Sequence, residues 1–390
     1  MSTTVTPDET TRPGATPGTD PSAGHSAEGG AGALPVLAVD LVTAPSLLEG
    51  LAPLTRGLEE AGIGALTLSD GGLHPIHVAA HLAPLTGRIG LLPRTDAIYV
   101  EPFHLATQLM SLDHISHGRA GWLLQAETDP SAAEAVGREV LGLEATAREA
   151  ADVLEAVRTI WGTWAPDAVV RDTERGVYVD ASRLQYADVE AETFSVRGPA
   201  ITPRSPQGLV PVLVADTDRA AAGERVSGEL ADGRVLDLDV SGGARVEELA
   251  AQIGSALAET GTEAASGAGE QADPSAASQQ VRLVRLVGLD LEADPLGTVR
   301  QLADELRSRG LIAPAPAASD ASGAAPSSAS ASASASASAS ASASASASAS
   351  ASASASGRTL RDLLGLPEAP FQLDPARRAD RARLTSEENA

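Results

Sequence analysis

The sequence contains no cysteine and no lysine among its 390 residues. The first absence excludes disulfide bonds and thiolate metal sites. The second leaves arginine to supply all fixed positive side-chain charge, and the formal net charge is −24. A chain this acidic has little attraction for nucleic acid or anionic lipid, so we expect neither nucleic acid nor a membrane as a partner. The ordinary role of such acidity is solubility.

Long apolar runs are also absent. No stretch of about 18 apolar residues occurs, so we expect no transmembrane helix. The first residues lack the basic start and the apolar core of a signal peptide. On these grounds we expect a cytoplasmic protein.

Stretches of unusual composition divide the chain. Residues 1–32 are rich in Thr, Pro, Gly and Ser and predict a disordered N-terminal tail. Residues 33–313 predict one barrel-sized domain with a flexible insertion at 261–279. Residues 314–356 end in an uninterrupted Ser-Ala alternation, which predicts a low-complexity linker. Residues 357–390 predict a short helix and a polar tail.

Within the large domain, apolar runs alternate with amphipathic segments. The runs predict parallel strands buried on both faces, and the segments between them have the apolar spacing of helices. We predict strands at 34–40, 65–68, 88–92, 121–124, 210–215, 234–240 and 281–289. We predict helices at 47–61, 74–85, 102–117, 144–164, 220–230, 246–257 and 296–309. This alternation predicts an α/β fold, a (β/α)8 TIM barrel whose last βα unit is missing or atypical.

The segment 101–125, EPFHLATQLMSLDHISHGRAGWLLQ, carries a distinctive pattern. A proline and an aromatic residue precede L-A-x-x-L-x-x-L-D-H-x-S-x-G-R-x-G-W. This pattern resembles the signature of luciferase-like flavin-dependent monooxygenases, in particular the branch of nitrilotriacetate and dibenzothiophene-sulfone monooxygenases. A second match is F-x-V-R-G-P from Phe194, followed by P-Q-G at 206–208 before a strand. The resemblance implies a TIM barrel of the bacterial-luciferase type.

The resemblance also implies a function. Reduced FMN bound at the barrel rim would react with dioxygen to oxidise a small organic substrate. A separate flavin reductase would supply the reduced FMN, because the sequence has no nicotinamide-binding fingerprint. We also expect a homodimer. Two alternatives stay open, namely a catalytically inactive paralogue that acts as a partner subunit or scaffold without cofactor, and a member that uses a deazaflavin.

Barrel geometry and the resemblance together place the cofactor site. In a TIM barrel the chemistry lies on the loops after the strands, here Asp40, Ser69-Asp70, 93–101, Gln125-Ala126 and 215–218. The family has an acid where Asp70 stands and a tyrosine where Tyr99 stands. The cofactor-binding candidates are Asp70, Thr95, Asp96, Tyr99, Gln125, Thr217, Asp218 and Arg219. No catalytic residue is identified.

The sequence departs from the family pattern at several site positions. Asp96-Ala97-Ile98 replaces a hydroxyl-rich run, and a histidine and a tyrosine of the branch fall on Leu143 and Ala147. The phosphate turn reads Ala215-Asp216-Thr217-Asp218-Arg219, with two carboxylates. At an effective dielectric of about 20, each like-charge pair at ~5 Å costs roughly 3 kcal/mol. We expect Arg219 to offset part of this repulsion between the turn and the flavin phosphate. Weak flavin binding would favour the inactive paralogue.

Other candidate groups have ordinary structural roles. His74, His77 and His81 share a helical face, but no carboxylate nearby in sequence completes a metal site, so we predict none. Asp113 is expected to form an ion pair with Arg119. Trp161 and Trp164 are expected to pack in the core, with a dimer interface as the alternative, and Asp237 and Asp239 to form a solvated acidic edge.

Overall fold

The structure, a computed structural model, describes residues 33–243, 245–266, 274–317 and 358–378. The predicted tail at 1–32 and most of the predicted linker at 314–356 therefore lie outside the described residues. Within the described part of the chain, every helix is too short or too polar to span a lipid bilayer.

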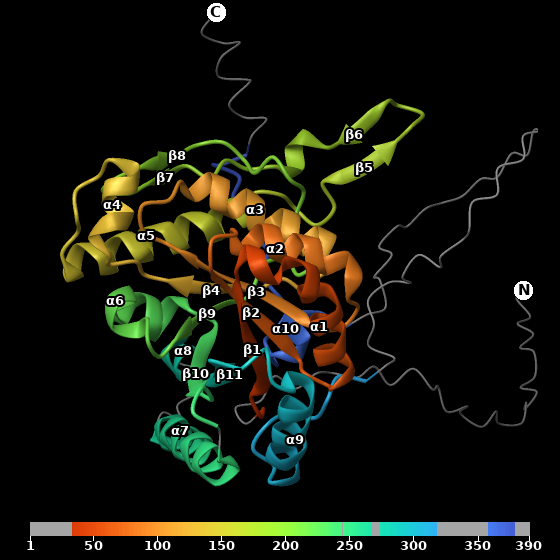
Figure 1. Cartoon of the computed structure of the whole chain (residues 1–390). Helices are drawn as coiled ribbons and strands as arrows, with labels where there is room; N and C mark the ends of the chain where they lie inside the picture. Colours follow the sequence, from red (N-terminus) through yellow and green to blue (C-terminus); the bar gives the residue numbers. More distant parts are fainter. Residues whose placement is uncertain (1–32, 244, 267–273, 318–357, 379–390) are drawn as a thin grey trace, which may run out of the picture.

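The described residues form a closed barrel of parallel strands in the order β1-β11-β10-β9-β4-β3-β2, covered by helices (Figure 1). The barrel strands are β1 Val36–Thr43, β2 Ala65–Asp70, β3 Gly90–Asp96, β4 Trp122–Gln125, β9 Val212–Ala215, β10 Gly233–Asp239 and β11 Val281–Val287. The longer helices are α1 Leu48–Glu60, α2 Pro75–Leu82, α3 Pro102–Ile115, α5 Leu143–Trp161, α7 Val246–Ser266 and α9 Pro295–Ser308. The predicted TIM-type barrel is confirmed.

The barrel closes with seven strands among the described residues. Where an eighth strand would lie, β11 pairs directly with β1 over four residue pairs, from Val36 with Leu283 to Val39 with Leu286. This part of the chain therefore contains no eighth barrel strand, which agrees with the predicted missing or atypical last βα unit.

Shorter elements decorate the barrel between β4 and β11. They are α4 Pro130–Val136, α6 Arg219–Glu224, a π-helix Arg225–Leu230, α8 Pro274–Gln279, and the antiparallel pairs β5 Val169–Asp172 with β6 Val177–Val179 and β7 Val189–Glu190 with β8 Ser195–Val196. Figure 1 shows the β5–β6 hairpin projecting from the body of the molecule.

Two helix predictions need correction. The helix predicted over 220–230 is broken at Gly223, whose φ is 78°, because this glycine lies against α5: a Cβ atom there would be 2.5 Å from that of Ala147. The helix predicted to end at 257 continues to Ser266, and α8 occupies 274–279. The part of the predicted insertion at 261–279 that the structure describes is thus helical.

The C-terminal helix α10, Leu360–Leu363, closes the amino-terminal end of the barrel (Figure 1). Leu360 and Leu364 join the cluster that fills the interior, with Val36, Ala38, Ala65, Leu92, Leu123, Leu213, Ala215, Val235, Leu283 and Leu366. Glycines at the strand starts make room for this helix. A Cβ atom on Gly90 or Gly121 would lie 2.7 Å from a methyl carbon of Leu360.

We therefore expect Gly121→Ala to lower the free energy of unfolding by about 1–3 kcal/mol, because the added methyl group overpacks this end of the interior. Urea denaturation measures the change. Gly50→Ala is the matched control, since Gly50 lies within α1 with no neighbouring atom within 4 Å of its added Cβ. That control should gain up to about 1 kcal/mol from helix propensity. Equal effects of the two variants would contradict the proposed overpacking.

The residues of the segment 101–125, which carries the family-like pattern, have mainly structural roles. Glu101 caps α3 by accepting hydrogen bonds from the N–H groups of Phe103 and His104, at 3.3 and 2.6 Å. Gly118 has the predicted left-handed conformation, with φ 84°. Trp122 is fully buried and donates its indole N–H to the Thr95 carbonyl at 3.1 Å.

The predicted Asp113–Arg119 ion pair is wrong. Asp113 is fully buried and accepts hydrogen bonds from the Gln207 side-chain amide at 2.6 Å and from the Ala120 N–H at 3.2 Å. Arg119 instead donates to the carbonyl groups of Ser116, Ile89 and Ala83, each at 2.8 Å. Burial lowers the pKa of Arg119 to about 10. Gln207 also accepts the Arg361 N–H at 2.7 Å, so the P-Q-G segment joins α3 to α10.

Trp161 and Trp164 are core residues, as predicted. Trp161 is fully buried and Trp164 is 9% exposed. Their indole N–H groups donate to the carbonyls of Ala106 and Ala200, at 3.1 and 2.8 Å.

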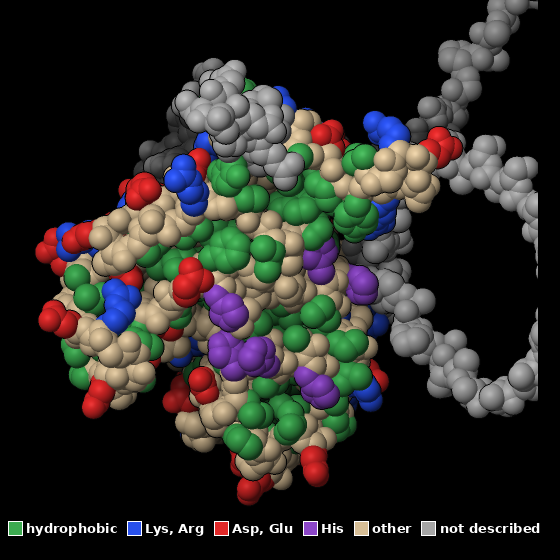
Figure 2. Space-filling view, turned by 90° about the horizontal axis from the view of Figure 1, so that it is seen from above, with side chains coloured by type: hydrophobic (Ala, Val, Ile, Leu, Met, Phe, Trp, Pro, Cys, Tyr) green, Lys and Arg blue, Asp and Glu red, His purple; other side chains and the backbone are tan. Residues whose placement is uncertain are grey.

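Histidine side chains gather on one face of the molecule, over α2 and α3 (Figure 2). His74, His77 and His81 are exposed, and the ring centroids of His74 and His77 are 4.8 Å apart. Partial desolvation of the ring, followed by the neighbouring His77, lowers the pKa of His74. Within the described ranges, no three or more acidic or histidine side chains are arranged to hold a metal ion.

Candidate active site at the barrel mouth

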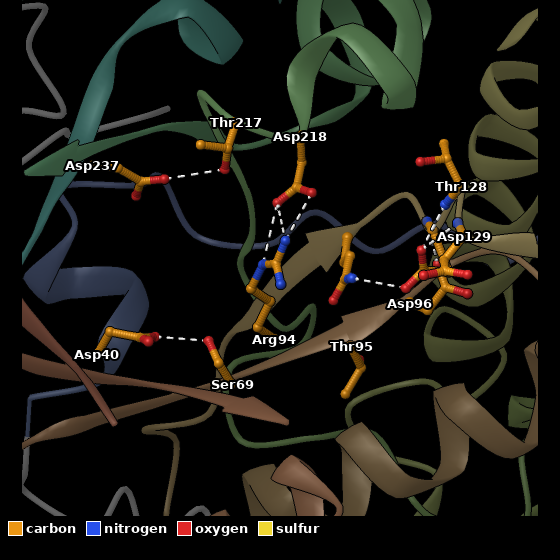
Figure 3. A network of polar contacts seen from close by, with 12 residues as sticks. Asp40, Ser69, Arg94, Thr95, Asp96, Thr128, Asp129, Thr217, Asp218 and Asp237 are labelled. Atoms are coloured by element: carbon orange, nitrogen blue, oxygen red, sulfur yellow. Dashed lines mark hydrogen bonds and ion pairs between the residues drawn. The ribbon is translucent and has the colours of Figure 1, made fainter. Parts of the chain in front are cut away.

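Polar side chains replace apolar ones in the barrel interior toward the carboxyl ends of the strands (Figure 3). Because side chains on a strand alternate between its two faces, an inward-facing apolar residue puts the residue two further on inside as well. Ala38 and Leu92 face inward, and so do Asp40 and Arg94. We use "polar ring" for Asp40, Thr67, Ser69, Arg94, Thr217, Asp218, Asp237 and Arg285.

One half of the polar ring is centred on Arg285. Its guanidinium binds both carboxylate oxygens of Asp237, at 2.7 and 2.8 Å, and lies 3.6 Å from the Asp40 carboxylate. Asp40 also accepts hydrogen bonds from the hydroxyls of Thr67 and Ser69, at 2.6 and 2.9 Å. The side chain of Arg285 is only 6% exposed, so these contacts satisfy a nearly buried charge.

The other half is the ion pair of Arg94 and Asp218. The Arg94 guanidinium donates to both Asp218 oxygens, at 2.9, 3.0 and 3.2 Å, across the mouth from β3 to the turn after β9. Burial raises the pKa of Asp218, and Arg94 opposes that rise. The adjacent Thr217 donates its hydroxyl to Asp237 at 3.1 Å, which joins the two halves (Figure 3).

A second acidic group lies beside the ring, at the ends of β3 and β4. Asp96 accepts the Glu127 N–H at 2.8 Å, and the Glu127 carboxylate accepts from the Gln125 side chain at 3.2 Å. Burial raises the pKa of Asp96 to about 7. Asp96 can therefore hold or release a proton near neutral pH.

This raised pKa predicts a pH dependence of stability. The folded chain binds the Asp96 proton more tightly than the unfolded chain, so unfolding free energy falls as pH rises from about 4 to about 7. We expect Asp96→Asn to match the wild type near pH 4 and to exceed it at pH 8 by on the order of 2 kcal/mol. Melting temperatures across this range measure the effect. Asp70→Asn, at an exposed strand end, controls for the lost charge, and an unchanged profile in Asp96→Asn would assign the dependence to another group.

The predicted cofactor-binding residues do not all meet at one place. Thr217 and Asp218 belong to the polar ring, and Asp96 and Gln125 lie beside it. The Thr95 hydroxyl is buried and forms no hydrogen bond with the described residues.

The other three predicted residues have partners elsewhere. Asp70 is exposed and accepts the Gly72 N–H at 2.7 Å in a local turn. The Tyr99 hydroxyl accepts the Leu141 N–H at 3.1 Å, and Arg219 donates to the Gln279 side chain at 2.5 Å.

The two carboxylates of the 215–219 turn are each paired with an arginine. Asp218 binds Arg94, and Asp216 accepts hydrogen bonds from the Arg234 guanidinium. The expected offset is therefore present, but it comes from Arg94 and Arg234. These pairs remove much of the repulsion that an isolated pair of carboxylates would exert on a phosphate.

Sequence reasoning missed Thr67 and Arg285, included Arg94 only as part of the loop 93–101, and underestimated Asp237. The expected solvated acidic edge is wrong for Asp237, which is 12% exposed and binds Arg285, whereas Asp239 is exposed. A signal was available: Arg94 and Arg285 are charged residues within strands whose other residues are mainly apolar. Such residues are retained in buried strands only with partners.

The chain is similar in sequence to proteins of known activity. A sequence profile for luciferase-like monooxygenases matches residues 30–281. N-acetyl-S-(2-succino)cysteine monooxygenase of Bacillus subtilis is 36% identical over 141 residues, which are 36% of this chain and 32% of that enzyme. Dibenzothiophene-sulfone monooxygenase of Rhodococcus erythropolis is 33% identical over 174 residues, 44% of this chain and 38% of that enzyme. The chain thus spans less than two fifths of either relative.

A solved structure shares the fold. The crystal structure of a long-chain alkane monooxygenase covers 72% of this chain and 93% of its own, with a TM-score of 0.55 and 16% sequence identity. At this identity the likeness concerns the fold alone.

Proposed function

Since the chain belongs to the luciferase-like monooxygenase family, we propose that it is a flavin-dependent monooxygenase that uses reduced FMN and dioxygen on a small organic substrate. The observation that carries this proposal is the polar ring. Inward-facing polar groups from six barrel strands, or from the turns that follow them, meet at the end where TIM barrels place their chemistry. Each of the ring's three aspartates contacts one of its two arginines.

The residues present fit a flavin mononucleotide. A phosphate needs cationic or N–H donors and hydroxyls, and Arg94 and Thr217 supply them at the mouth. The polar edge of a flavin ring needs hydrogen-bond partners, and the side-chain amide of Gln125 is a candidate. We therefore propose Gln125, Arg94 and Thr217 as cofactor-binding residues. The other cofactor assignments stay predictions, namely those of Asp70, Thr95, Asp96, Tyr99, Asp218 and Arg219.

In the proposed reaction, bound reduced FMN supplies the electrons that activate dioxygen. The protein's residues bind, orient and exclude water. The interior below the ring is apolar and is closed by α10, which prevents water from reaching the mouth through the barrel. Asp96, with a pKa of about 7, is the group suited to hold or release a proton beside the ring.

The proposed partners follow from the same scheme. They are dioxygen, a small-molecule substrate and a separate flavin reductase. We further propose that the chain forms a homodimer, as the family resemblance implies, and light scattering on the purified protein tests this.

The first test is binding of reduced FMN. We expect the melting temperature to rise when FMN reduced by dithionite is added without dioxygen. A ligand at 100 times its dissociation constant stabilises a protein by about 2.7 kcal/mol. Riboflavin, which lacks the phosphate, should give a smaller shift. No shift with either flavin at high micromolar concentration would contradict the proposal.

The alternative is a catalytically inactive paralogue that acts as a partner subunit. One observation favours it, namely that the Asp218 carboxylate already binds the guanidinium of Arg94. The two readings differ for Asp218→Asn. If FMN binds at the mouth, this variant should bind reduced FMN about tenfold more tightly than the wild type, because Arg94 becomes available to the phosphate. Fluorescence quenching measures the affinity, and riboflavin affinity should not change. In an inactive paralogue neither protein would bind.

A further inference from the structure

A cavity of about 540 Å³ lies at the opposite end of the barrel from the polar ring. It is lined by the P-Q-G segment that leads into β9 and by the C-terminal residues after α10. Its wall includes Arg204, Gln207, Gly208, Glu368 and Phe371. Because residues before a barrel strand lie at its amino-terminal end, this cavity is remote from the mouth.

Arg204, which lines this cavity, and the neighbouring Arg361 form no ion pair with the described residues. Neither Arg204 nor Arg361 has a carboxylate within 4.0 Å among the described residues. Arg204 donates to the carbonyls of Ala369 and Pro370, both at 3.3 Å, and Arg361 donates to that of Pro367 at 3.1 Å. One guanidinium nitrogen of each is buried without a hydrogen-bond partner in the described part of the chain.

Burial and the charge of Arg361 disfavour the charged form of Arg204, whereas the carboxylates of Asp232, Asp113 and Asp362 favour the charge of Arg361. Arg361 is 7% exposed, and Arg204 is half-buried with its guanidinium 5.2 Å from the centre of the Phe371 ring. Burial, followed by the charge of Arg361, lowers the pKa of Arg204, and Glu368 partly opposes this. A cation–π contact offsets only part of the cost of a buried charge, and buried charges in proteins are otherwise paired.

We propose that this cavity binds a small oxyanion, a phosphate or a carboxylate, with the Arg204 guanidinium as its main ligand. Arg361, in α10, adds positive potential near Arg204. The wall formed by Phe371 and the neighbouring prolines leaves room for an apolar part of the ligand. Because the P-Q-G segment and α10 also contact Asp113 and the barrel interior, a bound anion would stabilise the whole amino-terminal end.

The test is a thermal shift of the full chain with inorganic phosphate or acetate, against sodium chloride at matched ionic strength. We expect the melting temperature of the wild type to rise. The anion that gives the larger rise, phosphate or acetate, identifies the ligand class. Arg204→Gln should weaken the apparent affinity at least tenfold. Arg197→Gln, at a side chain that is 91% exposed, is the matched control and should respond like the wild type.

Two further variants keep the proposal falsifiable if Arg204→Gln folds poorly. Glu368→Gln removes the exposed carboxylate near Arg204 and should tighten anion binding severalfold, whereas Arg204→Lys should bind with intermediate affinity. A response that persists unchanged in Arg204→Gln, or that is lost in Arg94→Gln instead, would place the anion elsewhere and overturn the proposal.

Discussion

Replacing Arg94 by glutamine is expected to lower the free energy of unfolding by about 3 kcal/mol. The variant leaves the Asp218 carboxylate, which is 8% exposed, without its cation. Burial already raises the pKa of Asp218, and Arg94 is the largest influence that opposes the rise. In the variant, Asp218 would therefore be protonated more readily, so the loss should be larger at pH 8 than at pH 5.

A double-mutant cycle separates the ion pair from other roles of Arg94. The double variant Arg94→Gln/Asp218→Asn can replace the ion pair by a neutral hydrogen bond. We expect it to recover most of the loss, to within about 1 kcal/mol of the wild type, because replacing both partners avoids an unpaired buried charge. Urea denaturation of the four proteins measures the coupling. Additive effects of the two changes would show that the pair contributes little to the stability of the mouth.

Truncating Leu360 to alanine should cost about 3 kcal/mol of unfolding free energy. Leu360 is 1% exposed and packs into the barrel interior beside Gly90 and Gly121. Leu→Ala changes in such cores cost roughly 2–5 kcal/mol, because the removed methyl groups leave a cavity that closes only in part. Here the cavity would lie between a closed ring of strands and a short helix, and the strands have little freedom to move inward.

The matched control for this change is Leu143→Ala, since the Leu143 side chain is 64% exposed. It should change stability by no more than about 0.5 kcal/mol. Urea midpoints with unchanged slopes would assign the difference to the native state. If Leu360→Ala were as stable as Leu143→Ala, α10 would not be an integral part of the barrel core.

The strands could be predicted from sequence because each is an apolar run buried on both faces. Such local patterns need no knowledge of distant residues, and the strand Val281–Val287 is predicted in spite of its two arginines. Helix ends were harder to predict. The break at Gly223 depends on the close approach of Ala147, 76 positions earlier in the chain, and no local pattern contains that contact.

The candidate site was predictable only in outline. Barrel geometry identified the rim, and Thr217, Asp218, Asp96 and Gln125 do lie there. The pairing of charges could not be predicted, because Arg94 meets Asp218 across 124 positions and Arg285 meets Asp237 across 48. Asp113 shows the same limit: proximity in sequence favoured Arg119, whereas the actual partner, Gln207, lies 94 positions away.

Closure of the barrel between β1 and β11 has a consequence for self-association. A closed sheet presents no unpaired backbone edge, so another chain cannot extend the barrel by adding a strand. Among the described residues, free sheet edges belong to the two antiparallel pairs, β5–β6 and β7–β8. The projecting β5–β6 hairpin exposes Val170, Val177 and Tyr178. Any copy-to-copy contact made through backbone hydrogen bonds would therefore form on these small appendages and leave the barrel itself unchanged.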